Sequence, residues 1–214
     1  MRRLVLCLLT IAVACARPAL YYPDPSPAPP PPTEAASRPP RQPGSTSGAA
    51  ASPLVVMASM NDARSDLEYL RVRRIIVPVA GALTSKIEDS FDEPRDGGRM
   101  HRAVDILAPR GTPVLAADDG RILRMSTSPL GGISIYAADA ESRIVYYYAH
   151  LDRYHDAMSV GRALVKGDTI GFVGTTGNAP KDTPHLHFQV MRMPADGKYW
   201  NGEPINPYSL LVRQ

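Results

Sequence analysis

The segment TPHLHFQV, residues 183–190, decides the fold of this chain because polar and apolar side chains alternate along it. In a β-strand, successive side chains point to opposite faces of the sheet, so His185, His187 and Gln189 share one face. The leucine, phenylalanine and valine between them face the other way. The pattern predicts a strand that buries one apolar face and brings two imidazoles to one place.

A second segment, HRAVD at residues 101–105, supplies the partners that paired imidazoles need. Imidazole and carboxylate are common donors for zinc, and a catalytic zinc site needs three protein ligands with the fourth position left for water. His101, Asp105 and one of the paired histidines would complete such a set. Asp105 has apolar neighbours, so it is either a buried structural acid or a carboxylate that a metal ion neutralises, and we expect the metal.

In the order of its motifs, the chain resembles the lysostaphin-like (LytM-type) zinc peptidases over roughly residues 75 to 210. The matching segments are His-x-x-x-Asp at 101–105, APRGTPV at 108–114, DG at 119–120, YAHL at 148–151 and HLHF at 185–188. The resemblance implies an endopeptidase that hydrolyses peptide bonds of peptidoglycan stem peptides or cross-bridges, and it implies a β-rich fold.

The same resemblance implies that His101, Asp105 and His187 hold one zinc ion, while His150 and His185 stand beside it unligated. One free imidazole can take a proton and return it to the leaving amine, and the other can stabilise an oxyanion. Which of His150 and His185 has which role stays open. The chain has no His-Glu-x-x-His sequence, so a histidine must replace the glutamate base of thermolysin-type peptidases.

Two departures from the family pattern affect the expected substrate groove. Ala103 stands where glycine is common, and Phe91–Arg95 replaces the usual Phe-Gly-x-Arg entrance segment. Neither change removes a ligand, but together they leave open which cross-bridge is cut. The spacing also differs around Arg95, so the resemblance assigns it no role.

Two alternatives to hydrolysis follow from the same motifs. Some members of the family have lost the metal site and activate cell-wall amidases, so a non-hydrolytic binding module that activates amidases or organises the envelope is one alternative. A structural protein that keeps zinc for stability would need a fourth ligand, which only His150 or His185 could supply. All five site residues are present, which favours the enzyme.

Residues 1–14 have the features of an export signal: Arg2 and Arg3, an apolar run, and the small-residue pattern AVA at 12–14. The run is about half of the roughly 20 residues that a spanning helix needs. Cys15 follows directly, as in lipoprotein signals, although alanine stands at position 12 where leucine is usual. We therefore expect a periplasmic, membrane-anchored lipoprotein of the cell envelope with a lipid on Cys15; plain secretion is the alternative. The other cysteine lies within the leader, so no disulfide is expected.

Composition divides the chain after Cys15. Residues 15–53 are rich in proline and predict an extended, disordered tether. Residues 54–74 have helical spacing and predict an amphipathic helix on the outside of the domain, with Asp66 away from its apolar stripe. That stripe consists of Met60, Ala63, Leu67 and Leu70.

Residues 75–214 form the predicted peptidase domain, in which short apolar runs alternate with turns. The predicted strands are 75–79, 114–117, 121–125, 133–137, 143–148, 169–173 and 185–191. Asp118-Asp119-Gly120 predicts a hairpin turn with positive φ. No repeated helical crossover separates the strands, which favours an antiparallel, β-rich two-sheet domain over a doubly wound parallel sheet.

The charge balance bears on partners. The formal net charge is +3, and removing Arg2 and Arg3 with the leader leaves +1, because residues 1–14 contain no acidic residue. A nucleic-acid-binding domain typically carries a basic stripe, so no nucleic-acid partner is expected. No motif identifies a regulatory protein partner.

Overall fold

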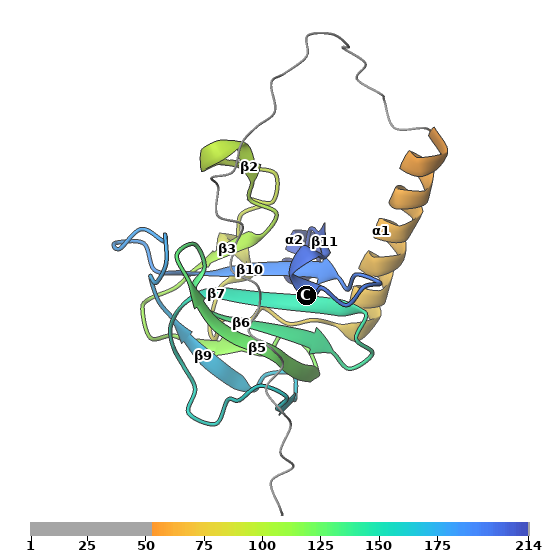
Figure 1. Cartoon of the computed structure of the whole chain (residues 1–214). Coiled ribbons are helices and arrows are strands. Elements are labelled where there is room, and N and C mark those ends of the chain that lie inside the picture. The colour runs from red at the N-terminus through yellow and green to blue at the C-terminus, as the bar shows by residue number, and fades with distance from the viewer. Residues whose placement is uncertain (1–52, 214) are drawn as a thin grey trace, which may run out of the picture. The chain divides into compact units, whose positions relative to one another are not determined.

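The structure is a computed structural model that describes residues 53–213 (Figure 1). The predicted leader, Cys15 and the predicted tether up to residue 52 lie outside the described residues. The helical elements are α1 (Pro53–Arg73), η1 (Thr84–Lys86), η2 (Asp96–Gly98), η3 (Tyr199–Asn201) and α2 (Tyr208–Leu211). The strands are β1 (Pro94–Arg95), β2 (Arg99–Met100), β3 (Val104–Leu107), β4 (Pro113–Leu115), β5 (Gly120–Ser128), β6 (Gly132–Asp139), β7 (Ile144–Tyr154), β8 (Ala163–Leu164), β9 (Thr169–Val173), β10 (His185–Arg192) and β11 (Glu203–Ile205).

Within residues 53–213, the strands form one nine-stranded sheet and a two-stranded ribbon of β1 and β2. The main strands follow the order β11-β10-β7-β6-β5-β8, while β3 pairs with β10, and β9 pairs with both β4 and β7. Every pairing is antiparallel. The expected antiparallel, β-rich fold is confirmed, and it places β3, β7 and β10 side by side.

Strand β10 separates the apolar core from a polar face of the sheet. Leu186, Phe188 and Val190 are fully buried, whereas His187 and Gln189 on the opposite face are half-buried. The Phe188 ring packs 5.3 Å from the Tyr148 ring of β7, measured between centroids. Burial of this apolar face removes hydrocarbon surface from water and fixes the register of the strand. The polar face of β10 therefore points away from the core.

Helix α1 packs beside β11 and α2. Leu70 is buried in the core, as the apolar stripe predicts, but Ala63 is exposed. Asp66, which was expected away from the contact face, is buried instead. The covered face of α1 is therefore turned relative to the predicted stripe and includes a carboxylate.

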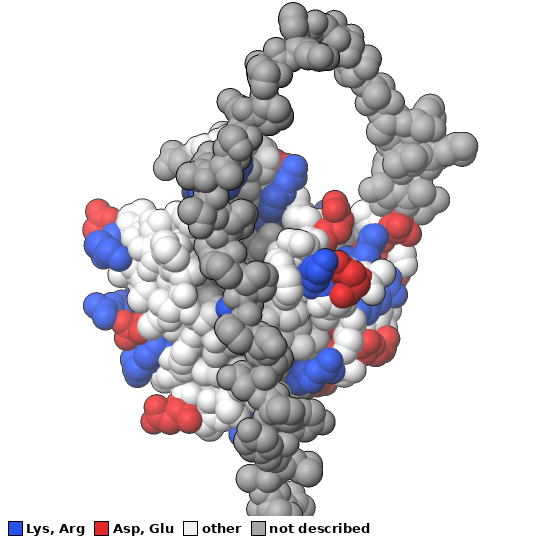
Figure 2. Space-filling model, in the orientation of Figure 1, with Lys and Arg blue, Asp and Glu red and all other residues white. Residues whose placement is uncertain are grey.

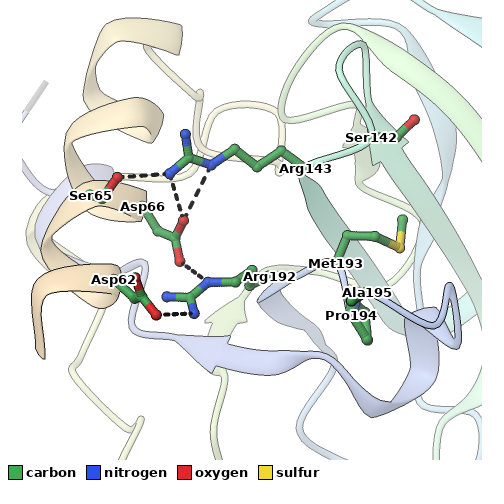
Figure 3. Close-up of a pocket in the computed structure, with 9 residues that line it drawn as sticks. All are labelled: Asp62, Ser65, Asp66, Ser142, Arg143, Arg192, Met193, Pro194 and Ala195. Carbon is green, nitrogen blue, oxygen red and sulfur yellow. Dashed lines mark hydrogen bonds and ion pairs between the residues drawn. The ribbon is translucent and has the colours of Figure 1, made fainter. Parts of the chain in front are cut away.

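Two arginines from the sheet explain the burial of Asp66 (Figure 3). Arg192 Nε, at the end of β10, donates to Asp66 Oδ2 over 2.6 Å, and Arg143 Nη2, just before β7, donates to Oδ1 over 2.9 Å. Arg143 also donates to Ser65 Oγ over 3.0 Å. Permanently charged, hydrogen-bonded partners make a buried carboxylate tolerable, so a polar residue anchors α1 to the sheet.

The predicted strand at residues 75–79 is wrong. Only Val79 forms a bridge, to Val114, and the segment otherwise runs as irregular backbone. Pro78 lacks the N–H that a strand interior requires. The carbonyl of Pro78 still accepts a hydrogen bond from Leu115 N over 3.0 Å, so the segment stays attached to the sheet at single points.

The predicted hairpin turn at Asp118-Asp119-Gly120 is also wrong. Strand β4 pairs with β9 rather than with β5, so these residues link two strands that are not partners. Gly120 does not have a positive φ. It opens β5, where a Cβ atom would lie 1.9 Å from the carbonyl oxygen of Ala138. The glycine is needed for close approach of two backbones rather than for a turn.

The surface of the described residues is mixed in charge. In the view of Figure 2, basic and acidic side chains alternate around the rim of the visible face and do not gather into one patch of a single sign. Among the helices of residues 53–213, none combines the length and the apolar character needed to cross a membrane.

Candidate metal centre

The structure brings the three predicted metal ligands together. His187 on β10 and Asp105 on β3 are direct partners across the two strands, and His101 lies in the segment that leads into β3. His101 Nε2 lies 3.0 Å from Asp105 Oδ1 and 3.0 Å from His187 Nδ1, and His187 Nδ1 lies 3.1 Å from Asp105 Oδ1. Three potential donor atoms thus form a nearly equilateral triangle.

The far side of the His101 ring fixes its tautomer. His101 Nδ1 lies 2.9 Å from the backbone carbonyl oxygen of Ser90. A carbonyl oxygen only accepts, so Nδ1 carries the proton and Nε2 turns a lone pair into the triangle. Ligating histidines commonly donate their other ring N–H to a carbonyl in this way.

The triangle fits a zinc ion. Ligand atoms around tetrahedral zinc, at about 2.0–2.1 Å from the metal, lie roughly 3.3 Å from one another. The three donor atoms here lie 3.0 to 3.1 Å apart, which is close to that spacing. One cation between them would satisfy the lone pairs of both rings and of the carboxylate. Burial alone would raise the pKa of Asp105, but the hydrogen bonds and positive charge that protonated His101 and His187 rings supply outweigh it and hold that pKa well below its usual range. A cation held between neutral rings would supply the same positive charge. The carboxylate is thus ionised and ready to bind a cation.

His150 reaches the site through an irregularity in β7. Between the pairs Ile135–Tyr148 and Ile133–Leu151, β7 has one residue more than β6, and His150 adopts a left-handed φ of 60°. Such a bulge breaks the alternation of faces and re-aims a side chain, and a positive φ is uncommon for a non-glycine residue. The sequence motif identified His150, but not this backbone conformation.

A loop after β9 holds the His150 ring. His150 Nδ1 lies 2.9 Å from the carbonyl oxygen of Thr176, so it donates and leaves Nε2 as the acceptor. The hydroxyl of Thr176 in turn donates to the carbonyl oxygen of Leu151 over 2.7 Å. Burial lowers the pKa of His150 to about 4, which keeps the imidazole neutral and able to accept a proton at neutral pH.

His185 stands next to His150. Their ring centroids lie 5.0 Å apart, and His185 Nδ1 lies 2.8 Å from the carbonyl oxygen of Thr183, which again leaves Nε2 as the acceptor. His185 Nε2 lies 3.9 Å from Asp105 Oδ1, farther than any member of the triangle. The structure therefore brings all five predicted residues into one place and separates three close donors from two neighbouring rings.

Arg95 is a site residue to which the sequence assigned no role. Its Nη2 lies 2.9 Å from Asp105 Oδ2, the oxygen that faces away from the histidines. The ribbon of β1 and β2 carries Arg95 to this position. A guanidinium on one oxygen orients the carboxylate so that the other oxygen faces the triangle. Residue spacing could not show this, because Arg95 and Asp105 meet only after the ribbon folds back.

The five residues line a groove of about 590 Å³. Its remaining walls include Tyr147, Gln189 and the exposed side chains of Leu107 and Leu130. Many of the lining residues belong to β3, β7 and β10, which run together below β2 in Figure 1. The groove thus joins a polar centre to partly apolar walls, as binding sites commonly do.

Comparisons with known proteins show what the chain is similar to. The family model described as peptidase family M23 matches residues 99–207, just over half of the chain. The chain is 35% identical over 114 residues to the DD-carboxypeptidase/endopeptidase Mpg of Neisseria meningitidis serogroup B, a match that covers 53% of this chain and 23% of that protein. It is 34% identical over 133 residues to the peptidoglycan DD-endopeptidase ShyC of Vibrio cholerae serotype O1, covering 60% of this chain and 26% of ShyC.

Among solved structures, the catalytic domain of the antimicrobial peptidase lysostaphin from Staphylococcus simulans is similar at 33% identity, with a TM-score of 0.47. That match covers 53% of this chain and 80% of the lysostaphin domain. The chain spans only about a quarter of the length of the two curated relatives named above.

Proposed function

The chain belongs to peptidase family M23, and on that premise we propose that it is an exported zinc endopeptidase that hydrolyses peptide bonds in peptidoglycan stem peptides or cross-bridges. The observation that carries the proposal is the triangle of His101, Asp105 and His187, whose donor atoms lie 3.0 to 3.1 Å apart. With three protein donors, such a site leaves a fourth position open, as catalytic zinc sites do.

The proposed roles follow from what each ring can do. Zinc, when bound, supplies Lewis acidity and makes a potent nucleophile available near neutral pH. His150 is neutral at pH 7 and has its Nε2 free, so it can accept a proton and pass it to the leaving amine. His185 can donate a hydrogen bond to an oxyanion when its Nε2 is protonated. The same geometry permits the exchanged assignment of the two rings.

The alternative of a non-hydrolytic module that activates amidases requires a damaged metal site. The described residues instead hold the three donors, both neighbouring rings and an open groove together. A purely structural zinc site would need a fourth protein donor, and the potential donor group has three members within residues 53–213. Both observations favour hydrolysis.

Digestion of purified peptidoglycan tests the proposal. We expect the zinc-loaded protein to release new peptide fragments, identified by mass spectrometry, and Asp105→Ala to release none. Removal of zinc by a chelator should abolish the release, and added zinc should restore it. If the zinc-loaded protein released no fragment by itself but increased the release of glycan-free peptides by a purified amidase, the activator function would replace this proposal.

We further propose that residues 1–14 direct export, that a lipid on Cys15 anchors the protein in the envelope, facing the periplasm, and that residues 15–53 act as a tether. The leader composition and the position of Cys15 support this proposal. Cys15→Ser should move the protein from the membrane fraction to the soluble envelope fraction. If fractionation did not change, plain secretion or another attachment would be the better account.

A further inference from the structure

A row of aromatic rings leads away from the metal centre across the polar face of the sheet. The Tyr147 ring lies 6.1 Å from the His187 ring, measured between centroids, and it stacks on Tyr136 at 4.3 Å. Tyr199 follows at 5.3 Å from Tyr136, and Trp200 at 5.0 Å from Tyr199. Four short steps thus connect the candidate metal ligand to an indole on the surface.

Strand register explains why the rings line up. Tyr147 on β7 and Tyr136 on β6 are direct cross-strand partners, so their side chains share the face that also carries His187. The turn η3 places Tyr199 and Trp200 beside Tyr136. Trp200 remains 47% exposed, although a large aromatic side chain in a folded domain is usually mostly covered.

Polar side chains flank this row. Gln189 on β10 is the cross-strand partner of Tyr147, and Arg124 on β5 is the partner of Tyr136. Both are half-buried on the same face, and Gln189 also lines the groove. The row therefore combines aromatic rings, of which the Trp200 indole is exposed, with hydrogen-bonding groups beside them.

A pyranose ring has the matching chemistry. Its C–H groups form an apolar face that stacks on aromatic rings, while its hydroxyl and acetamido groups point outward to polar side chains. The row meets the groove at Tyr147, so one molecule could occupy both the outer rings and the candidate metal centre.

We propose that Tyr136, Tyr199 and Trp200 form a subsite for the glycan strand of peptidoglycan. This inference rests on the proposed function, because the peptide to be cut would hang from that glycan. An extended peptide spans about 3.3 to 3.6 Å per residue, so a stem of three or four residues reaches roughly 10 to 14 Å from the cleaved bond. That length carries the sugar past Tyr147 and onto the outer part of the row.

Trp200 is the only tryptophan in the chain, so its fluorescence reports on this subsite alone. We would titrate the zinc-loaded, full-length protein with a peptide-free tetramer of β-1,4-linked N-acetylglucosamine. A saturable change in emission is expected, and Tyr199→Ala should weaken the apparent affinity roughly 3- to 10-fold. Val160→Ala, which alters an exposed apolar residue outside the row, serves as the matched control and should bind like the wild type.

A kinetic comparison adds a second readout. A cross-linked muropeptide that carries its disaccharides is compared with the same peptide after the sugars have been removed. The wild type should show the higher kcat/KM on the sugar-bearing substrate, and Trp200→Ala should bring the ratio of the two values toward one. Melting temperatures of both variants check that the fold is retained.

The outcomes separate this inference from the proposed function. Equal rates on both substrates with no response to the saccharide would overturn the glycan subsite and leave the peptidase standing. A response to the saccharide without cleavage of either substrate would support the subsite and remove the peptidase. A response to phospholipid vesicles but not to the saccharide would assign Trp200 to a membrane contact and overturn the proposal.

Discussion

Asp105 and Asp66 are both carboxylates that bind side chains from distant parts of the chain, but their partners differ in kind. Asp66 pairs with Arg143 and Arg192, which are charged at every physiological pH. Asp105 pairs with two imidazoles through one oxygen and with a single arginine through the other. An imidazole that carries one N–H and one nitrogen lone pair is uncharged, so the two rings leave the negative charge of Asp105 available to a cation.

The difference separates an acid that holds a helix on the sheet from an acid that is available to a metal ion. The Asp66 side chain is almost completely buried, and permanently charged arginines neutralise its carboxylate. It therefore holds α1 on the sheet and does not need a further cation. The Asp105 side chain keeps 24% of its surface exposed and opens onto a groove. A buried carboxylate therefore indicates a binding site only when the side chains around it do not neutralise its negative charge.

The largest effect that tests this comparison is loss of the metal. His101→Ala, Asp105→Ala and His187→Ala should each lower the zinc content of the purified protein, because each removes one corner of the triangle. The Lewis acidity of zinc contributes several kcal/mol, so activity should fall by about 10³-fold or more. Elemental analysis together with peptidoglycan cleavage measures both. Stoichiometric zinc in all three variants would sink the assignment.

Removing the neighbouring rings should give a smaller loss of a different kind. His150→Ala and His185→Ala should keep most of the zinc, since neither ring belongs to the triangle, yet cleavage should fall by about 10²- to 10⁴-fold. The comparison of zinc content with rate in the same preparation separates these rings from the ligands. Near-normal rates in both variants would mean that neither ring transfers a proton.

Removing Asp66, the acid that holds α1 on the sheet, should change the stability of the fold rather than its zinc content or activity. Asp66→Ala leaves two arginines without their carboxylate, and because both guanidinium groups are partly exposed we expect about 2 to 3 kcal/mol of destabilisation, below the usual range for a fully buried pair. The melting temperature should fall by roughly 5 to 10 °C. Zinc content should stay at the wild-type level.

Asp62→Ala is the control for that measurement. Asp62 contacts Arg192 over 3.3 Å but is mostly exposed, so its removal should change stability by no more than about 0.5 kcal/mol. If Asp66→Ala lost zinc or activity while still folded, the division between the acid that holds α1 and the acid that is available to a metal ion would break down.

The functional face could be predicted from sequence to a large extent, because its information is local. The spacing of His101 and Asp105 and the alternation at 185–190 fix which side chains share a face, whatever the rest of the chain does. The bulge that turns His150 and the ribbon that delivers Arg95 depend on pairing between strands, which no single segment encodes. Those features emerged only with the fold.

The region around α1 was predicted less well, for the same reason. Helical spacing indicated a helix at nearly the right residues, but its covered face depends on Arg143 and Arg192, which lie 77 and 126 residues from Asp66. An apolar stripe predicts burial only when the opposing surface is apolar as well. The predictions around Pro78 and Gly120 were wrong for a similar reason, since residues that are near them in space, rather than in sequence, determine their backbone conformation.

The smallest expected effect concerns Arg95, the one permanent cation in the Asp105 cluster. Two opposing contributions act here: the guanidinium orients the carboxylate, which favours zinc, and its charge repels zinc, which disfavours it. Arg95→Lys keeps the charge but loses the planar fork, so zinc affinity should fall about tenfold, within the range seen when outer partners of metal ligands are removed. Arg95→Gln loses both, so its affinity should fall less than that of Arg95→Lys. Competition with a colorimetric zinc chelator measures both variants. If Arg95→Lys bound zinc as tightly as the wild type, orientation of the carboxylate by Arg95 would contribute nothing to zinc affinity. The arginine would then have no part in what distinguishes Asp105 from Asp66.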